Sequence, residues 1–509
     1  QCLVGSEMCI RDRFRIMKKE KRNNKNDKIA EIKDNRKKKT KNSNRQIMVV
    51  TYLFLLLFAG MIGYFVKFQV KDSDEVINNN YNNRQEVLEE SVIRGSILSD
   101  DGQVLAHTIV SADGTEIRSY PYGTLFAHSV GFSTHGKTGV ELMANYKLLT
   151  SNEPINEIAE NDLKGDKHIG DNVTTSLNIN LTKVAYNALE DNQGAIIAIE
   201  PSTGKIITMV SKPDFDPNTI DSIYDTLVAD NSNSNLLNRA TNGLYTPGST
   251  FKLFTLIEYI RENPDYSNYT FNCKGSITQE DHTIHCAGGR WHGNEDLKDS
   301  FANSCNSSFV NLGLTLDRAK FKKLCESLFF NNDLPLSMSY KNSQFSLDET
   351  SSTFETMQTV IGQGKTLITP IHLAMIASAI ANDGVLMKPY MITSVENYLG
   401  TSVKKYSPEK AQNLFEKPEV DVLKEFLRAV VTQGTGTKLK SDLYTAYGKT
   451  GTAQINDGSQ SNSLFMGYAE NEGKKLAICV VLEDMPEGST PAVPVAKAVF
   501  DEYFSKEAN

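Results

Sequence analysis

The sequence predicts an α+β fold in which helices pack on one β-sheet, preceded by a smaller β-rich domain and a single apolar span. Runs of β-branched residues occur near both ends of the C-terminal region, at 194–212 and 476–482. Apolar segments with helical spacing follow them, at 372–381 and 495–504. Strands at both ends of a region, with helices between them, are typical of an α+β sheet packed by helices.

The N-terminal part predicts a membrane anchor. Residues 1–16 resemble a translated sequencing-adapter artefact, with a short native leader as the alternative, so Met17 is the expected start. Residues 17–46 are rich in Lys, Arg and Asn and are predicted to be a disordered tail. Residues 47–66 carry no charge and match one bilayer span. The basic run before this span predicts a cytoplasmic N-terminus, an uncleaved transmembrane anchor and an exported remainder. Nucleic-acid binding by the basic run is not favoured.

The exported remainder is predicted to contain two domains, because 509 residues are too many for one compact domain. Residues 67–169 have the size of a small domain and are expected to form a β-rich, membrane-proximal pedestal. Residues 170–509 are expected to form the larger α+β domain. At its start, two β-branched runs flank the turn sequence Pro201-Ser-Thr-Gly204, which predicts a β-hairpin over 194–212.

A hydroxyl and an amine lie three residues apart at a predicted helix start, in Ser249-Thr-Phe-Lys252. Thr246 is a plausible N-cap and Pro247 suits the first helical position. Residues i and i+3 share a helix face, so the Lys252 amine can reach the Ser249 hydroxyl and act as its base. A Ser-x-x-Lys match alone is weak, since a chain of this length holds about two or three by chance.

Two motifs further along the chain strengthen this interpretation. They are Ser304-Cys305-Asn306 and Lys449-Thr450-Gly451-Thr452. Together with Ser249-x-x-Lys252 they make the trio of elements found in penicillin-binding proteins and class A β-lactamases.

The words around the motifs resemble class B penicillin-binding proteins. Examples are Pro247-Gly-Ser-Thr-Phe-Lys252, Gly448-Lys-Thr-Gly-Thr-Ala453 and, upstream, Arg94-Gly-Ser-Ile97. The resemblance covers nearly everything from Arg94 to the C-terminus. Ser99 departs from it, standing where an acidic residue is usual, and 462–465 lacks the tryptophan common after the third motif.

The resemblance implies a peptidoglycan D,D-transpeptidase with the penicillin-binding transpeptidase fold, an antiparallel sheet flanked by helices. Ser249 would attack the carbonyl between two D-alanines of a stem peptide, and would bind penicillin covalently. Lys252 would be its base, Ser304 would relay a proton to the leaving D-alanine, and Asn306 would hold the stem-peptide amide.

The resemblance also assigns the third motif to an edge strand beside which the substrate docks. Lys449 would supply positive potential, and the Thr450 and Thr452 hydroxyls would suit the substrate carboxylate. Gly451 would let the substrate approach closely. The oxyanion hole would be the backbone N–H groups of Ser249 and Thr452.

The implied partners are peptidoglycan stem peptides, β-lactam antibiotics, the membrane and a separate glycan polymerase, with no cofactor, metal or nucleic acid. Two alternatives stay open. One is a membrane-anchored serine β-lactamase or β-lactam sensor, although class D relatives carry Val where this chain has Asn306. The other is a non-catalytic scaffold for cell-wall assembly, which would not need the intact trio.

The cysteines give no clear pattern. Cys273 and Cys286 could form a disulfide or remain free thiols. His285 and His292 lie near them, but the spacing matches no zinc motif, so no metal site is predicted. Cys305 is interpreted as a small packing residue within the second motif.

Overall fold

A computed structural model describes residues 4–68, 84–230, 232–455, 460–486 and 490–505. The leader residues 1–3 and the part of the predicted pedestal at 69–83 lie outside the described residues. Contacts divide the chain into two units, Gln1–Asn79 and Asn80–Asn509.

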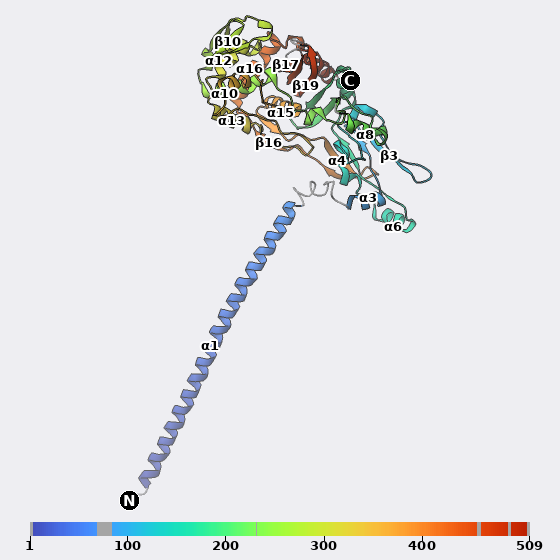
Figure 1. Ribbon diagram of the computed structural model, residues 1–509. Coiled ribbons are helices and arrows are strands. Elements are labelled where there is room, and N and C mark those ends of the chain that lie inside the picture. The colour runs from blue at the N-terminus through green and yellow to red at the C-terminus, as the bar shows by residue number, and fades with distance from the viewer. Residues whose placement is uncertain (1–3, 69–83, 231, 456–459, 487–489, 506–509) are drawn as a thin grey trace. The chain divides into compact units, whose positions relative to one another are not determined.

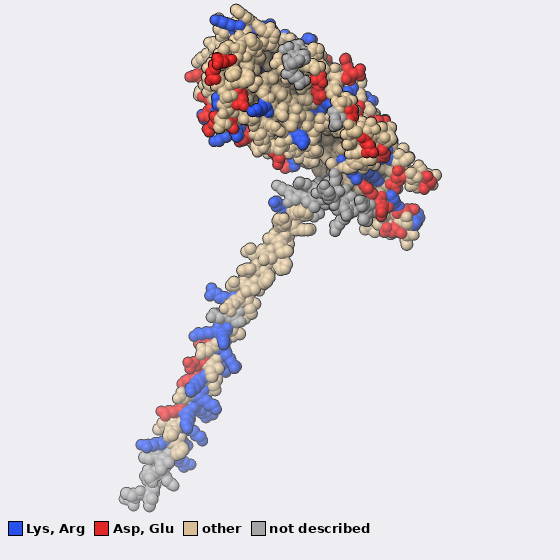
Figure 2. All heavy atoms as spheres, in the orientation of Figure 1, with Lys and Arg blue, Asp and Glu red and all other residues tan. Residues whose placement is uncertain are grey.

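The first unit is one long helix, α1 (Val4–Lys67) (Figure 1). By length and composition this helix could cross a membrane. Its Lys and Arg side chains gather on the part before the uncharged stretch 47–66 (Figure 2). The described residues of the predicted disordered tail, 17–46, are helical instead. Lys, Arg, Glu and Ala favour helices, and extending a helix already formed by the apolar stretch avoids the cost of nucleation.

The second unit is built on a five-stranded antiparallel sheet of order β17-β18-β19-β7-β8. Its strands are β7 (Gly194–Ile199), β8 (Ile206–Lys212), β17 (Thr445–Ile455), β18 (Gln460–Asn471) and β19 (Lys474–Pro486). β7 and β8 pair antiparallel, so the predicted hairpin over 194–212 is confirmed. β17 lies at one edge of the sheet, and its register with β18 pairs Lys449 with Met466.

Both faces of this sheet are covered, and successive residues of a strand enter different cores. Ile197 packs in a core with the helix α15 (Pro370–Ala381). Its neighbour Ile196 packs in a second core with α7 (Ile179–Ala188) and α17 (Ala492–Ser505). Burial on both faces explains why β7 is apolar throughout, in place of the alternation of a half-exposed strand.

A second, six-stranded sheet has the order β15-β14-β6-β2-β3-β4. Its strands are β2 (Ile97–Leu98), β3 (Val104–Val110), β4 (Glu116–Ser119), β6 (Asn172–Thr175), β14 (Ile392–Glu396) and β15 (Ser402–Lys405). β6 was expected to open the larger domain, but it pairs with β2 on one side and β14 on the other. The predicted pedestal sheet is thus completed by strands from beyond residue 170.

Beside this sheet lies a buried ion-pair cluster. Glu141 is fully buried and accepts hydrogen bonds from Arg94 Nε and Arg118 Nε, each at 2.7 Å. The flanking helices are α3 (Arg84–Ser91), α4 (Gly139–Met143), α5 (Asn145–Leu148) and α6 (Ile155–Lys164), and a short parallel pair joins β1 (Val92–Ile93) to β5 (His168–Ile169).

The remaining helices and short strands complete the second unit. The helices are α8 (Ile220–Ala229), α9 (Arg239–Asn242), α10 (Lys252–Glu262), α11 (Leu297–Ala302), α12 (Asn306–Gly313), α13 (Arg318–Ser327), α14 (Thr353–Thr359) and α16 (Lys417–Thr432). The short strands are β9 (Thr270–Cys273), β10 (Ser276–Gln279), β11 (His282–His285), β12 (Gly293–Asp296), β13 (Val385–Met387) and β16 (Lys410–Asn413). β9 pairs with β12, and β10 with β11.

Candidate active site

Ser249 lies in a 3-10 turn, Gly248–Phe251, that leads directly into α10. The helix start was correctly placed, although Pro247 precedes the turn in the capping position expected for Thr246. Gly248 has φ +53°, and a Cβ there would lie 2.5 Å from the Thr452 carbonyl oxygen. Only glycine fits this position, and its absence of a side chain lets the Ser249 turn pack against β17.

The Lys252 amine is fully buried and makes three hydrogen bonds. It donates to the Ser304 carbonyl oxygen at 2.7 Å, to Asn306 Oδ1 at 2.7 Å and to Ser304 Oγ at 3.3 Å. Among the described residues no hydrogen bond reaches Ser249 Oγ. The predicted contact between Lys252 and Ser249 is therefore replaced here by contacts between Lys252 and the second motif.

Ser304 occupies the loop between α11 and α12 with a left-handed backbone, φ +60°. This conformation is uncommon for a residue other than glycine, and such strain concentrates at functional sites. Ser304 Oγ accepts a second hydrogen bond from Lys449 Nζ at 3.0 Å. The amide of Asn306 donates from Nδ2 to the His285 carbonyl oxygen at 2.9 Å, which turns its Oδ1 toward Lys252.

The third motif lies on the edge strand β17, as the resemblance implied. Thr450 is buried, and its hydroxyl pairs with that of Thr435 at 2.6 Å. Gly451 has a structural reason within the fold, because a Cβ there would lie 2.9 Å from both Pro247 O and Thr250 Cγ2. Its lack of a side chain admits the Ser249 turn, and the expected close approach of the substrate stays a prediction. Thr452 is half-buried.

Sequence reasoning missed Thr435. It stands in Gly434-Thr-Gly436, and a hydroxyl residue between two glycines was a weak signal that could have been noticed. Its backbone N–H donates to the Ala302 carbonyl oxygen at 3.1 Å, which joins it to the helix before the second motif. Thr435 therefore connects the second motif to the third.

Both active-site amines have lowered pKa values. Burial lowers the pKa of Lys252 to about 8, against the opposing influence of Cys305, Cys286 and Glu295. Burial, and then the positive charge of Lys252, holds the pKa of Lys449 well below its ordinary value. Two like charges that share the Ser304 hydroxyl disfavour simultaneous protonation, so one amine is readily neutral.

Cys305, which was predicted to be a small packing residue, lies in a cluster of thiols. Its Sγ lies 3.8 Å from Cys286 Sγ, which in turn lies 3.6 Å from Cys273 Sγ. His292 Nδ1 lies 3.3 Å from Cys273 Sγ. The prediction of no metal site considered only the spacing of Cys273, Cys286, His285 and His292. It could not include Cys305, which folding brings in from the second motif.

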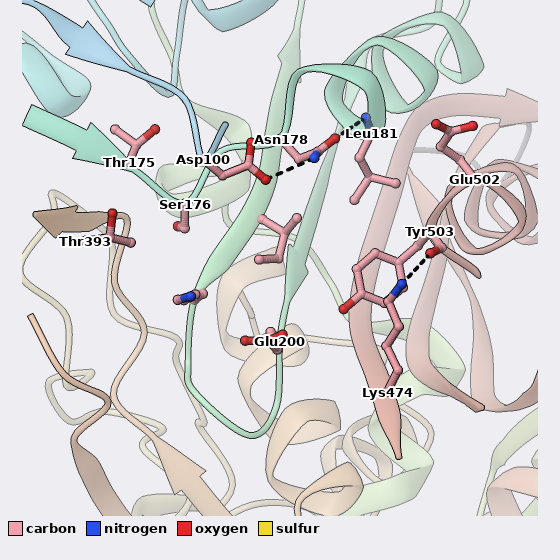
Figure 3. Close-up of a pocket in the computed structure, with 12 residues that line it drawn as sticks. Asp100, Thr175, Ser176, Asn178, Leu181, Glu200, Thr393, Lys474, Glu502 and Tyr503 are labelled. Carbon is pink, nitrogen blue, oxygen red and sulfur yellow. Dashed lines mark hydrogen bonds between the residues drawn. The ribbon is translucent and has the colours of Figure 1, made fainter. Parts of the chain in front are cut away.

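A cavity of about 340 Å³ lies elsewhere in the second unit (Figure 3). Asp100, Asn178, Glu200 and Lys474 are among the residues that line it, and none of the three motifs does. Asn178 Nδ2 donates to Asp100 Oδ2 at 3.0 Å across its rim. The hydroxyls of Thr175 and Ser176, which also line it, donate to backbone carbonyl oxygens.

The site combines a serine at a helix start, a buried lysine base candidate and a second lysine on an edge strand. This arrangement defines the class of serine acyl-transfer sites that use lysine in place of histidine.

Comparison with known proteins agrees with this class. A family model described as the penicillin binding protein transpeptidase domain matches residues 194–501, and one described as the penicillin binding protein A dimerisation domain matches residues 94–173. The chain therefore belongs to the penicillin-binding protein transpeptidase family, and the predicted class B resemblance and fold are confirmed.

Individual relatives are distant in sequence, but their matches cover most of this chain. The peptidoglycan D,D-transpeptidase PbpA of Mycolicibacterium smegmatis is 27% identical over 491 residues, covering 89% of this chain and 98% of the relative. The D,D-transpeptidase domain of a peptidoglycan glycosyltransferase from Eggerthella lenta is 28% identical with a TM-score of 0.73, covering 82% of this chain and 99% of that one. Penicillin-binding protein A of M. tuberculosis, solved as an imipenem acyl-enzyme complex, has the same fold at 24% identity, with a TM-score of 0.73 over 81% of this chain and 99% of that one.

Proposed function

We propose that this protein is a peptidoglycan D,D-transpeptidase that cross-links stem peptides through a Ser249 acyl-enzyme and binds penicillin at the same residue. The carrying observation is the buried Lys252 amine, which is hydrogen-bonded to Ser304 and Asn306 and lies one turn after Ser249. Its lowered pKa makes the neutral amine available as a base near neutral pH.

Acylation begins with attack of Ser249 Oγ on the carbonyl carbon between the two D-alanines of a donor stem peptide. Lys252 takes the hydroxyl proton as the C–O bond forms. The C–N bond then breaks, and the leaving D-alanine nitrogen receives a proton by way of Ser304, whose hydroxyl contacts both lysine amines. Backbone N–H groups of Ser249 and Thr452 stabilise the oxyanion, typically by about 3 kcal/mol for each donor.

The second half-reaction reverses these proton transfers. An amine of a second stem peptide attacks the ester carbonyl, loses a proton to the neutral Lys252, and forms the cross-link as the C–O bond breaks. Ser249 Oγ recovers its proton from Lys252. Penicillin stops the cycle after acylation, because its opened ring stays attached to the carbonyl and blocks the incoming amine.

Intact-mass measurement tests this proposal. Incubation of the full-length, detergent-solubilised protein with penicillin G should add one drug mass, and Ser249→Ala should abolish the addition. Persistence of the adduct in the variant would remove Ser249 from the mechanism. Rapid loss of the adduct with hydrolysed drug accumulating would identify a β-lactamase, and a folded wild type that never acylates would identify a scaffold.

For topology, we propose that residues 17–46 are cytoplasmic, 47–66 span the membrane and the second unit is outside the cell. The basic run before an uncharged span supports this orientation. Alkaline phosphatase fused after residue 170 should be active, whereas green fluorescent protein fused there should be dark. The opposite pattern would reverse the orientation.

We also propose that a separate glycan polymerase works with this protein, since the region between span and transpeptidase is too short for a polymerase domain. Crosslinking in cells followed by mass spectrometry should recover such an enzyme with the wild type. Its absence, with the other wall enzymes detected, would remove this partner.

A further inference from the structure

Four side chains with metal-binding atoms meet beside the second motif, and nothing in the proposed reaction uses them. They are Cys273, Cys286, His292 and Cys305, and their sulfur and nitrogen atoms all lie within 4.8 Å of one another. The three thiols are buried, with exposures of 1%, 2% and 0%. They make up a cluster of their own that contains no other fully buried apolar residue.

The donor set is that of a structural zinc site. Three thiolates and one imidazole are a standard tetrahedral ligand set for Zn²⁺. Zn–S bonds of about 2.3 Å place two sulfurs of a tetrahedron about 3.8 Å apart. The separations of 3.6 Å and 3.8 Å between neighbouring sulfurs fit those edges. A Cys273–Cys286 disulfide would use two of the four groups and leave Cys305 and His292 facing it unused.

Backbone N–H groups already point at two of the sulfurs. Gly275 N donates to Cys273 Sγ at 3.4 Å, and Ser308 N donates to Cys305 Sγ at 3.4 Å. Gly275 itself has φ +87°, and a Cβ there would lie 2.7 Å from the Gly289 carbonyl oxygen and from Trp291 Cδ1, so only glycine fits beside Cys273. Such N–H bonds stabilise thiolates that bind metals and orient them toward the ion.

The local fold gives such an ion a structural purpose. Cys273 ends β9, Cys286 follows β11, and His292 precedes β12, so three ligands come from one small β-region, 270–296. This region has few apolar residues, and small segments without a core are commonly held by a metal or by disulfides. The fourth ligand, Cys305, belongs to the second motif and joins this region to the active site.

We propose that Cys273, Cys286, His292 and Cys305 bind one Zn²⁺, and that the ion holds the Ser304–Asn306 segment in place. Cys305 is covalently between the two residues that contact Lys252, so fixing its sulfur limits the movement of both. The same β-region also receives the Asn306 amide through the His285 carbonyl oxygen. Cys305 is thus a positioning residue, since it touches no reacting atom.

Metal content tests the site directly and does not depend on the acyl-transfer reaction. Full-length protein, purified in detergent without a metal-affinity tag, should contain about one zinc per chain by elemental mass spectrometry. Growth in zinc-depleted, cobalt-supplemented medium should give the intense visible bands of tetrahedral Co²⁺ and near-ultraviolet thiolate charge-transfer absorption.

Matched variants separate the site from general effects on folding. Cys286→Ser should lose the zinc, whereas Cys325→Ser, which changes a fully buried cysteine of α13, should keep it. His292→Cys offers a fourth thiolate and should keep the zinc, while His292→Ala should lose it. His285→Ala, beside Cys286 but exposed, should also keep it.

The link to the active site has its own test. Removal of zinc from wild type with a chelator should slow penicillin acylation on the order of tenfold, the scale seen when groups that hold functional residues in place are lost. Added Zn²⁺ should restore the rate. An unchanged rate in zinc-free protein would overturn the positioning role. Protein without zinc, whether with three reactive thiols or with a Cys273–Cys286 disulfide seen as a 2 Da loss, would overturn the metal site.

Discussion

Two buried charge clusters in the second unit follow opposite rules. Beside the six-stranded sheet, Glu141 is buried between Arg94 and Arg118, and each ion has an opposite partner. In the active site, Lys252 and Lys449 are buried together, and among the described residues neither forms an ion pair. Although burial opposes it, the two arginines lower the pKa of Glu141 and keep it charged, whereas burial lowers both lysine pKa values toward neutrality.

The difference distinguishes a cluster that stabilises the fold from one that is suited to catalysis. A compensated charge in the interior keeps its proton state and holds elements together, at a desolvation cost that its partners offset. An uncompensated amine changes its proton state easily, which is what a catalytic base requires. Substitutions in the two clusters should therefore affect different measurements.

The largest effect is expected from Lys252→Arg. Guanidinium stays protonated at working pH, so the penicillin acylation rate should fall by ~10²–10⁴-fold, the usual contribution of a general base. Stopped-flow fluorescence or quenched gel assays with a fluorescent penicillin would measure it. Lys449→Arg keeps the positive charge without removing the base and should retain measurable acylation. A Lys252→Arg rate near that of wild type would show that another group activates Ser249.

Glu141→Gln should affect stability and leave chemistry intact. It leaves Arg94 and Arg118 buried without a counter-charge, which costs about 3–5 kcal/mol in comparable sites. The midpoint of thermal unfolding should drop clearly, while the acylation rate of protein that remains folded should match wild type. A Glu141→Gln variant as stable as wild type would show that this buried cluster contributes as little to stability as surface ion pairs do.

The pH profile of acylation follows from the Lys252 pKa. Below about 8 the folded protein carries a protonated amine, so the rate should rise roughly tenfold per pH unit and level off above that value. The contribution of Lys252 to the free energy of unfolding also increases with pH. Between about 8 and 10.5 the unfolded chain binds the proton that the folded chain has released, so stability rises with pH. A rate independent of pH between 6 and 9 would contradict the neutral-base mechanism.

The smallest effect is expected from Thr435→Val, which removes the hydroxyl that pairs with Thr450. Loss of one such hydrogen bond is worth about 1 kcal/mol, or roughly a fivefold change in acylation rate. Thr437→Val, close by in the chain, should have no comparable effect. Equal effects of the two variants would mean that the Thr435–Thr450 bond has no special role.

The sequence best predicted the features that depend on short-range patterns. The β7–β8 hairpin and the α10 start were predictable because turn residues and helix spacing act over a few residues. The left-handed Ser304 and the Thr435–Thr450 bond were not, since both depend on segments distant along the chain. The cysteine cluster was missed for the same reason, because its ligands from one β-region meet Cys305 only after folding.

The six-stranded sheet has a consequence for the order in which an emerging chain can pair its strands. Ile97 pairs with Val173, and Val173 pairs with Val395, so neighbours in the sheet are separated by long stretches of chain. A chain that emerges N-terminus first exposes β6 long before β14 arrives, and an open strand edge invites pairing with other chains. Contacts of this sequence separation also slow folding. The sheet that holds the early strands β2 and β3 is therefore completed only after residue 405 has emerged.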